Sequence, residues 1–376
     1  MTGLALKTLL FDWRRFAPAA VAVGFSGLLV LLQAGLILGV FSLASVYVTK
    51  SSADLWVGFP GVQSIDLGRP IGGATELFLR ADPRVAQVEP FYWGSGEWRT
   101  SRHGMVNVYI VGLDPAPGAM VLSQVLPTDL RAALSEPDAV LIDRADLRKL
   151  EAGVGGLAEI NGHQVRIVGV TDGLRALGGV NVIASAATAR RLDPAIGNGE
   201  GAAYFTARLN DPAQASGAVA DLRAVGRQRG FEPMTSKTFA DRSVRYWLGE
   251  SGAGVAFVFG SAVAILVAVI VTSQTLAAAV AASLKDYAAL RALGFTIGAL
   301  RAIVLAQTAW IAAAGVVLAG VLTTILAMVA RWQATPLVMT APMVGGAAGL
   351  VALVAFGSGL WALRRVARAD PAALLL

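Results

Sequence analysis

Two long stretches of this chain carry no charged side chain. They run from Ser251 to Ser283 and from Ala302 to Ala330, and neither contains Asp, Glu, Lys or Arg. A helix needs about 20 predominantly apolar residues to cross a hydrocarbon core of roughly 30 Å. Only 15% of all residues are charged, whereas soluble domains usually carry about 25%. Both stretches are therefore predicted to span a membrane.

Two further apolar runs complete the predicted membrane part. The run from Phe16 to Thr49 would measure about 50 Å as one helix, so we expect it to project from the bilayer as a stalk, and we expect the same of the second span. It is too long for the core of a signal peptide and lacks a convincing cleavage site, which favours a retained anchor. The fourth run, about Val344 to Leu363, follows a link that contains Pro336 and Pro342.

The predicted fold is an α-helical membrane protein with four transmembrane helices and a large α+β extracytoplasmic domain between helices 1 and 2. The predicted segments, in chain order, are a cytoplasmic amphipathic helix (1–16), the first span with its stalk (17–48), the extracytoplasmic domain (49–250), the second span with its stalk (251–280), a cytoplasmic coupling helix (281–300), the third span (301–330), an outer loop (331–342), the fourth span (343–363) and a cytoplasmic tail (364–376).

Basic residues near the ends of the spans predict the orientation. Three basic segments fall on one side of the membrane, namely Lys7, Arg14 and Arg15, then Lys285, Arg291 and Arg301, then Arg364, Arg365 and Arg368. The opposite short loop has only Arg331. Because cytoplasmic loops are enriched in Lys and Arg, we expect a multi-pass protein of the inner (cytoplasmic) membrane with both termini in the cytoplasm.

The net charge of +6 does not indicate a nucleic-acid partner. Residues 50–250 hold 21 basic and 22 acidic side chains, so the positive charge is concentrated around the apolar runs. Lipid-facing topology distributes charge in this way, whereas a DNA-binding face gathers it on one surface.

Alternating apolar residues and turn signals predict one or two small α+β lobes in the extracytoplasmic region. Predicted strands are Asp54–Val57, Ser64–Leu67, Gly104–Leu113, Leu157–Ile160, Gln164–Thr171 and Ala202–Leu209. Predicted helices are Pro127–Leu134, Asp143–Leu150, Ala186–Leu192 and Asp211–Val225, and Asp241–Glu250 is expected to lead into the second span. Asn161-Gly162 is a strong signal for a hairpin turn.

A short charged segment, Leu284–Phe295, interrupts the apolar sequence between the second and third spans; we call it the elbow. It has helical spacing, with four residues on one face: Tyr287, Leu290, Arg291 and Gly294. Gly294 is suited to the left-handed cap of a helix, and Thr296 to the start of the next. A surface helix between two spans can carry force from a soluble partner into the bilayer, which predicts a coupling helix.

Signals of catalysis are absent from the sequence. There is no phosphate-binding loop with a Gly-Lys-Ser/Thr ending, and the two histidines, His103 and His163, lack the spacing of metal ligands. We therefore predict no catalytic, cofactor-binding or metal-binding residues, and a chain that is not an enzyme.

A few polar, small or aromatic residues inside the spans are candidates for a dimer seam or substrate cleft: Gln33, Gly35, Gly39, Phe257 and Phe259. Contact between helices of one subunit is the competing explanation for the polar and small residues, and packing against lipid for the two phenylalanines.

The segment Lys285-Asp-Tyr-Ala-Ala-Leu-Arg-Ala-Leu-Gly-Phe295 resembles the Lys-Glu-Tyr-Ala-Thr-Leu-Lys-Ala-Leu-Gly-Tyr pattern of the DevC-like branch of the MacB/FtsX-type ABC transporter permease family. The basic tail Arg364–Ala373, which contains Asp-Pro-Ala, and Ala53–Val57 followed by Pro60-Gly61 are also similar to that family. The elbow departs from the Glu-rich coupling segment of the broader family. The likeness covers both ends and the last third of the chain.

The resemblance implies a homodimer whose subunits each sit on a separately encoded ABC ATPase, two copies in all, with ATP-Mg bound to the ATPase and no cofactor in this chain. It also implies mechanotransmission, in which closure of the ATPases moves the stalks, and an association with a HlyD-type periplasmic adaptor and an outer-membrane duct. Tyr287, Leu290, Arg291 and Leu293 would dock in the ATPase groove, with Lys285 and Asp286 setting the register.

We therefore expect the permease subunit of an ABC-type exporter of an amphiphile such as a lipid or glycolipid, because the apolar spans contain no charged residue. Haem is an alternative substrate. An FtsX-like permease that transmits a signal to an outer hydrolase or sensor without transport is the main alternative function. A membrane-anchored binding module whose outer domain acts alone is a third hypothesis.

Overall fold

The computed structural model describes residues 11, 13–102, 104–177, 179–197, 201–283, 287, 289–291, 293–332 and 337–368. The chain divides into two compact units. The membrane unit comprises the described residues up to Gly39 and from Ala256 onward, and the α+β unit comprises Val40–Val255. The first and second long helices, Trp13–Ser42 and Gly252–Ala282, therefore each contribute residues to both units.

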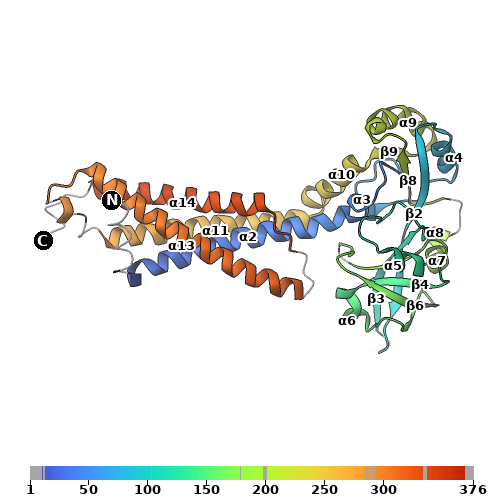
Figure 1. Ribbon diagram of the computed structural model, residues 1–376, viewed down its shortest axis with the longest axis horizontal. Helices are drawn as coiled ribbons and strands as arrows, with labels where there is room; N and C mark the ends of the chain where they lie inside the picture. Colours follow the sequence, from blue (N-terminus) through green and yellow to red (C-terminus); the bar gives the residue numbers. More distant parts are fainter. Residues whose placement is uncertain are drawn as a thin grey trace. The chain divides into compact units, whose positions relative to one another are not determined.

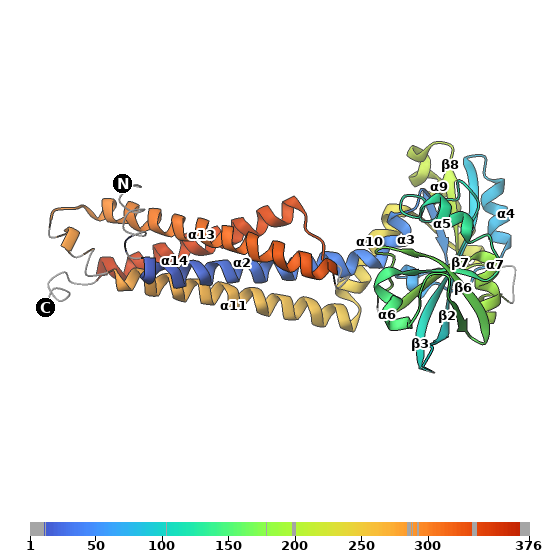
Figure 2. The same cartoon turned by 60° about the horizontal axis from the view of Figure 1, so that its bottom comes forward.

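Four long helices form the membrane unit: α2 (Trp13–Ser42), α11 (Gly252–Ala282), α13 (Ile297–Trp332) and α14 (Ala341–Arg368). They run alongside one another (Figures 1 and 2). In the described part of the chain, four apolar segments are long enough to cross a membrane, at Phe16–Thr49, Gly252–Ala282, Ile297–Ala330 and Ala341–Ser358. The predicted fold, four apolar helices with a large α+β domain between the first and second, is confirmed.

Small residues let α2 and α13 approach closely within the bundle. A Cβ added at Gly24 would lie 2.7 Å from Leu318, and one added at Gly27 would lie 2.9 Å from the Cβ of Ala319. Such contacts between small residues are the usual means by which helices pack in lipid, where no hydrophobic force drives them together. The larger α2 side chains Phe16 and Val23 are buried in a cluster that also contains Ile311 and Ala312 of α13.

The α+β unit contains nine strands and several short helices in its described residues. The strands are β1 (Leu55–Gly58), β2 (Val85–Arg99), β3 (Met105–Leu113), β4 (Ala139–Asp143), β5 (Leu157–Ile160), β6 (His163–Thr171), β7 (Val180–Ser185), β8 (Tyr204–Leu209) and β9 (Glu232–Thr235). The helices are α3 (Val46–Thr49), α4 (Ala74–Ala81), α5 (Thr128–Ala133), α6 (Leu147–Leu150), α7 (Ala186–Leu192), α8 (Pro194–Gly197), α9 (Ala215–Arg229) and α10 (Ser236–Gly249), with 3₁₀ turns η1 (Leu43–Ser45), η2 (Ile65–Leu67), η3 (Arg144–Asp146) and η4 (Pro212–Gln214).

Strand β2 belongs to two lobes at once. Its first half, Val85–Phe91, pairs with β8, and its second half, Tyr92–Arg99, pairs with β3. The first lobe has the antiparallel order β9–β1–β8–β2. With α4 after β1 and α9 after β8, this lobe has the βαββαβ arrangement of ferredoxin-like folds (Figure 1).

The second lobe is inserted between β2 and β8 of the first. Its pairings run β2–β3–β7–β4–β6–β5 and return to β2 through Trp98 and Arg99, so the strands close into a ring. A closed ring removes exposed strand edges. One buried cluster, which includes Trp98, Ile110 and Ile160, fills this lobe.

Most strands predicted from the sequence are confirmed, but the strand predicted at Ser64–Leu67 is wrong. This segment contains the 3₁₀ turn η2, and the hydroxyl of Tyr204 hydrogen-bonds the carbonyls of Ser64 and Ile65 at 3.1 Å. The Ser64 side chain also hydrogen-bonds that of Asp66. Local bonds of this kind compete with a strand ladder.

Candidate coupling site

The elbow ends in a left-handed turn at Gly294. Its φ is +93°, a conformation that costs other L-residues about 1–2 kcal/mol. The N–H of Gly294 donates to the carbonyl of Arg291 at 3.0 Å, and the N–H of Phe295 donates to that of Leu290 at 3.1 Å. These two bonds form a Schellman motif, so the predicted glycine cap is confirmed.

Thr296 begins the next helix directly after this cap. Its Oγ1 accepts a hydrogen bond from the N–H of Ala299 at 3.2 Å, as expected of a residue at a helix N-terminus. The predicted start is therefore confirmed, and hydrogen bonds fix the backbone on both sides of Phe295.

Tyr287 holds the elbow against α13. Its side chain is 3% exposed and lies in a cluster formed by Val280 of α11 and three α13 residues, Leu300, Ile303 and Val304. Its hydroxyl donates to Oε1 of Gln307 at 2.6 Å, which satisfies two polar groups that would be costly to bury alone. Within this chain, Tyr287 therefore serves as an internal anchor.

Beside this anchor, three apolar side chains are exposed. Leu293 is 77% exposed, Phe295 40% and Ile297 43%; we call these residues the elbow surface. Leu290 and Arg291 are half-buried. Lys285 and Asp286, the other predicted coupling residues, lie outside the described residues. The elbow thus combines a buried side that fixes its position with an apolar side available to a partner.

The candidates for a dimer seam or substrate cleft make contacts within the subunit. Gln33 accepts a hydrogen bond from Ser261 at 3.0 Å. Gly35 accepts one from the N–H of Val338 at 3.1 Å, and a Cβ on Gly35 would lie 2.9 Å from Leu337. These contacts are those of helix–helix and helix–loop packing. The dimer seam and substrate cleft remain predictions.

The three other candidates differ in burial. Gly39 is buried and Phe257 is half-buried, whereas Phe259 is 71% exposed. Phe259 therefore has an apolar surface available to lipid or to another helix.

The residues that end the first apolar run are buried in the α+β unit. Val46, Tyr47 and Val48 belong to a cluster that also contains Trp56 of β1, Phe91 of β2, Ile183 of β7 and Phe239 of α10. The Tyr47 ring lies 5.6 Å from that of Trp93, and its hydroxyl accepts a hydrogen bond from the side chain of Asn181. One core thus joins both lobes to α3 and α10. This role of Tyr47 was not predicted from the sequence, although an aromatic residue at the end of an apolar run is a signal for it.

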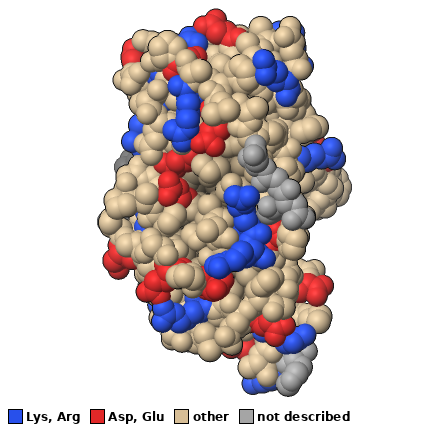
Figure 3. Space-filling model, turned by 90° about the vertical axis from the view of Figure 1, so that its right-hand side faces the viewer, with Lys and Arg blue, Asp and Glu red and all other residues tan. Residues whose placement is uncertain are grey.

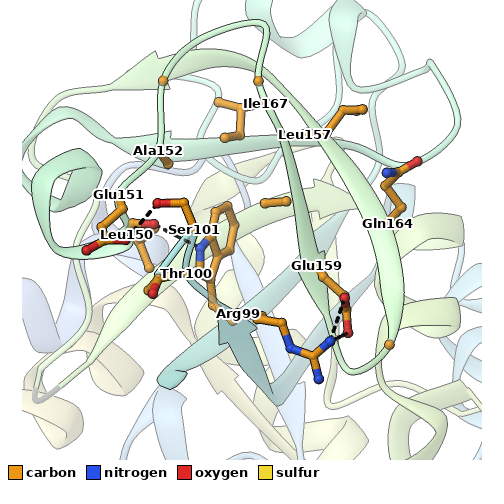
Figure 4. A pocket seen from close by; sticks show the side chains of 15 residues that line it. Arg99, Thr100, Ser101, Leu150, Glu151, Ala152, Leu157, Glu159, Gln164 and Ile167 are labelled. Atoms are coloured by element: carbon orange, nitrogen blue, oxygen red, sulfur yellow. Dashed lines mark hydrogen bonds and ion pairs between the residues drawn. The ribbon is translucent and has the colours of Figure 1, made fainter. Parts of the chain in front are cut away.

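A cavity of about 370 Å³ opens where β2 and β5 separate. Figure 4 shows Arg99 directed toward Glu159 on one wall and Ser101 toward Glu151 on another. Nitrogen and oxygen of the first pair are 3.0 Å apart, and the Ser101 hydroxyl donates to Glu151 at 2.8 Å. Because its charged side chains are already paired, this cavity has no unpaired charge to offer a ligand.

The described residues of the α+β unit form no metal site. In the part of the chain that the structure describes, no group of three or more His, Asp or Glu side chains could hold a metal ion. On the face shown in Figure 3, acidic and basic side chains are interspersed rather than gathered by sign.

The fold defines a class of protein, a multi-pass membrane protein with a large α+β domain between its first two helices. Two family models match the sequence: a MacB-like periplasmic core domain over residues 19–225 and an FtsX-like permease C-terminal domain over residues 258–371. The chain therefore belongs to the MacB/FtsX-like permease family. No curated protein matches it.

Two solved structures are similar to the chain. The periplasmic region of MacB from Actinobacillus actinomycetemcomitans is 16% identical, with a TM-score of 0.34 over 52% of this chain and 94% of that one. The extracellular domain of YknZ, a noncanonic ABC-type transporter from Gram-positive bacteria, is 13% identical, with a TM-score of 0.33 over 49% of this chain and 100% of that one.

Proposed function

We propose that this permease subunit of a MacB/FtsX-type ABC transporter couples ATP hydrolysis by a separate ATPase to the export of an amphiphile. The observation that carries the proposal is the elbow, where Tyr287 is buried against α13 while Leu293 and Phe295 are exposed. A protein that pushed on the exposed side would move α13 through the buried side. The apolar patch suits a groove on a soluble ATPase.

The docking contacts proposed here differ from those predicted from the sequence. Leu293, Phe295 and Ile297 form the apolar contact, and Arg291 contributes charge at its edge. Tyr287 acts inside the subunit by keeping the elbow in register with α13. In this proposal ATP-Mg binds the partner ATPase, and this chain needs no cofactor.

The proposed topology places both termini and the elbow in the cytoplasm and the α+β unit outside. The distribution of Lys and Arg around the spans supports it. The core shared by α3, α10 and both lobes supports mechanotransmission, because movement of either helix would reach the whole α+β unit. The homodimer and the localisation in the inner membrane follow from the family resemblance.

The proposed partners outside the cytoplasm are a HlyD-type adaptor and an outer-membrane duct. The likeness of the elbow to the DevC pattern supports this choice. The absence of Asp, Glu, Lys and Arg between Ser251 and Ser283 favours a lipid, a glycolipid or a similar amphiphile as the substrate.

The experiment that tests the coupling role combines co-purification with ATPase measurements. We expect Leu293→Asp with Phe295→Asp to abolish binding of the ATPase and its stimulation by this chain, because two carboxylates would be buried in an apolar contact. Leu157→Asp is the control, since Leu157 is 64% exposed in the α+β unit. Full stimulation by the elbow variant would overturn the docking role.

A deletion strain tests export itself. Loss of a lipid or glycolipid from the outer membrane would support the proposal. Unchanged lipids, together with a hydrolase or sensor that loses its activity, would favour the signal-transmitting alternative. Accumulation of haem in the cell would identify haem as the substrate instead.

A further inference from the structure

A hollow of about 500 Å³ lies on the first lobe of the α+β unit, between α9, β9 and the turn after β1. Its lining residues are Pro60, Arg223, Arg227, Phe231 and Glu232. The volume falls within the range of small-molecule sites. The two arginines are one helical turn apart on α9, at i and i+4, so they project from the same side of the helix.

The arginines are the unpaired charges of this hollow. Both are exposed, and neither makes an ion pair among the described residues. The carboxylate of Glu232 has other partners, because its Oε1 accepts from Arg242 at 2.7 Å and its Oε2 from the N–H of Gly61 at 2.8 Å. Arg223 lies close enough to help lower the pKa of Glu232 but forms no hydrogen bond with it. The hollow therefore presents net positive charge.

Stabilisation of the α9 dipole accounts for Arg227 but not for Arg223. A basic residue stabilises the last turn of a helix, and Arg227 and Arg229 lie in the last turn of α9. Arg229 already stacks on Phe78, with its guanidinium carbon 3.9 Å from the ring centroid. Arg223 lies more than a turn further back, where the dipole effect has faded.

The floor beside the arginines is apolar and closely packed. Gly226 lets Phe231 lie directly under α9, since an added Cβ would be 2.4 Å from the Phe231 carbonyl oxygen and 3.0 Å from its ring. Gly230, with φ +76°, turns the chain from α9 into β9. Pro60 forms the opposite rim. Phe231 is only 2% exposed, so the exposed Pro60 supplies most of the apolar surface beside the two cations.

Hydrogen bonds hold the opposite rim, the turn after β1, to β9 and to α10. Glu232 binds the N–H of Gly61, and Arg242 of α10 donates both to Glu232 and to the carbonyl of Val62, the latter at 3.2 Å. The walls are therefore held in place by hydrogen bonds rather than formed by a loose loop.

We propose that this hollow binds an anionic amphiphile, with a phosphate or carboxylate head between Arg223 and Arg227 and its hydrocarbon part against Pro60. Guanidinium groups match such heads through paired, charge-assisted hydrogen bonds. Because the floor is apolar, a free phosphate ion would use only half of the site. Binding does not depend on the ATPase, so this site stands or falls independently of the proposed coupling function.

The test is a titration of the full chain in nanodiscs of zwitterionic lipid with dihexanoyl phosphatidate, a short-chain soluble anion, followed by calorimetry and corrected for empty nanodiscs. We expect saturable binding. Dihexanoyl phosphatidylcholine lacks the net charge and glycerol 3-phosphate lacks the chains. Each should therefore bind at least about tenfold more weakly than dihexanoyl phosphatidate. Equal binding of glycerol 3-phosphate would overturn the proposal in favour of a free-phosphate site.

Matched variants locate the binding. Arg223→Gln with Arg227→Gln should weaken binding of dihexanoyl phosphatidate at least about tenfold and lower the thermal midpoint only slightly, because both side chains are exposed. Arg148→Gln with Lys149→Gln removes the same charge from exposed positions on α6 and should leave affinity unchanged. Equal affinity of the Arg223/Arg227 variant and the wild type, or the absence of saturable binding, would overturn the site.

Discussion

The hydroxyl of Tyr287 donates a hydrogen bond of 2.6 Å to Oε1 of Gln307, and both side chains are buried. The bond joins the elbow to the interior of α13. Since the ring of Tyr287 also packs on Val280 of α11, one side chain connects the helices on either side of the elbow. A push on the elbow surface would therefore reach the two helices together.

Tyr287→Phe tests this link. The change leaves the Gln307 carbonyl oxygen buried without this donor, so we expect a loss of about 1–3 kcal/mol of stability and reduced stimulation of the partner ATPase. Thermal unfolding in detergent and an ATPase assay measure the two effects. Tyr287→Phe with Gln307→Leu removes both polar groups and should recover part of the stability. A double variant less stable than the sum of the single changes would contradict the link.

Gly294→Ala tests the turn at the end of the elbow. With φ at +93°, we expect alanine to cost about 1–2 kcal/mol and to weaken coupling, because the residues of the elbow surface lie on both sides of this turn. Gly298→Ala is the control near the start of α13, where an added Cβ meets nothing closer than 3.8 Å. That control should be neutral or slightly stabilising. Equal midpoints for both variants would argue against a strained position at Gly294.

Local chemistry made the elbow and the hairpin predictable from the sequence. Glycine at position 294 and threonine at position 296 carry their preferred capping conformations in their own covalent structure. Asn161 and Gly162 have φ of +50° and +81°, as the turn between β5 and β6 requires. The four spans were predictable from the length of each apolar run without a charged residue, which is also a property of the local sequence.

Features that depend on distant partners were missed. β4 and β7 are buried at every position, so they lack the alternation that marks a strand. β2 contains Pro90, Gly94 and Gly96, which normally weaken a strand prediction. Gly94 is required because a Cβ there would lie 2.4 Å from the carboxylate of Asp193. The anchoring of Tyr47 and Tyr287 likewise depends on residues far along the chain.

Tyr47→Phe tests the core that joins both lobes to the end of the first apolar run. It removes the hydroxyl that accepts from Asn181, whose other donor bond to the described residues, to the carbonyl of Leu174, is long at 3.3 Å. We expect a loss of about 1–3 kcal/mol, measured by thermal unfolding. Tyr109→Phe is the control, since its ring also packs on Trp93, at 5.4 Å, and its hydroxyl makes no hydrogen bond to the described residues. A larger loss in the control would contradict this assignment.

Glu232→Gln tests the rim of the hollow lined by Arg223 and Arg227, through the pH dependence of stability. Burial raises the pKa of Glu232, but the hydrogen bonds from Arg242 and the Gly61 N–H outweigh burial and leave this pKa below its ordinary value. The ion pair therefore stabilises the fold above the unfolded-state pKa of about 4.3, and this contribution is lost as pH falls through the lower folded-state pKa.

Because glutamine cannot form the ion pair, the difference in thermal midpoint between wild type and Glu232→Gln should be largest near neutral pH and should shrink below about pH 4. Glu159→Gln, which breaks the more exposed pair with Arg99, should lower the midpoint less at neutral pH. A midpoint difference that stayed constant from neutral to acidic pH would show that Glu232 acts through packing alone. The rim of the hollow would then not depend on the charge of its carboxylate.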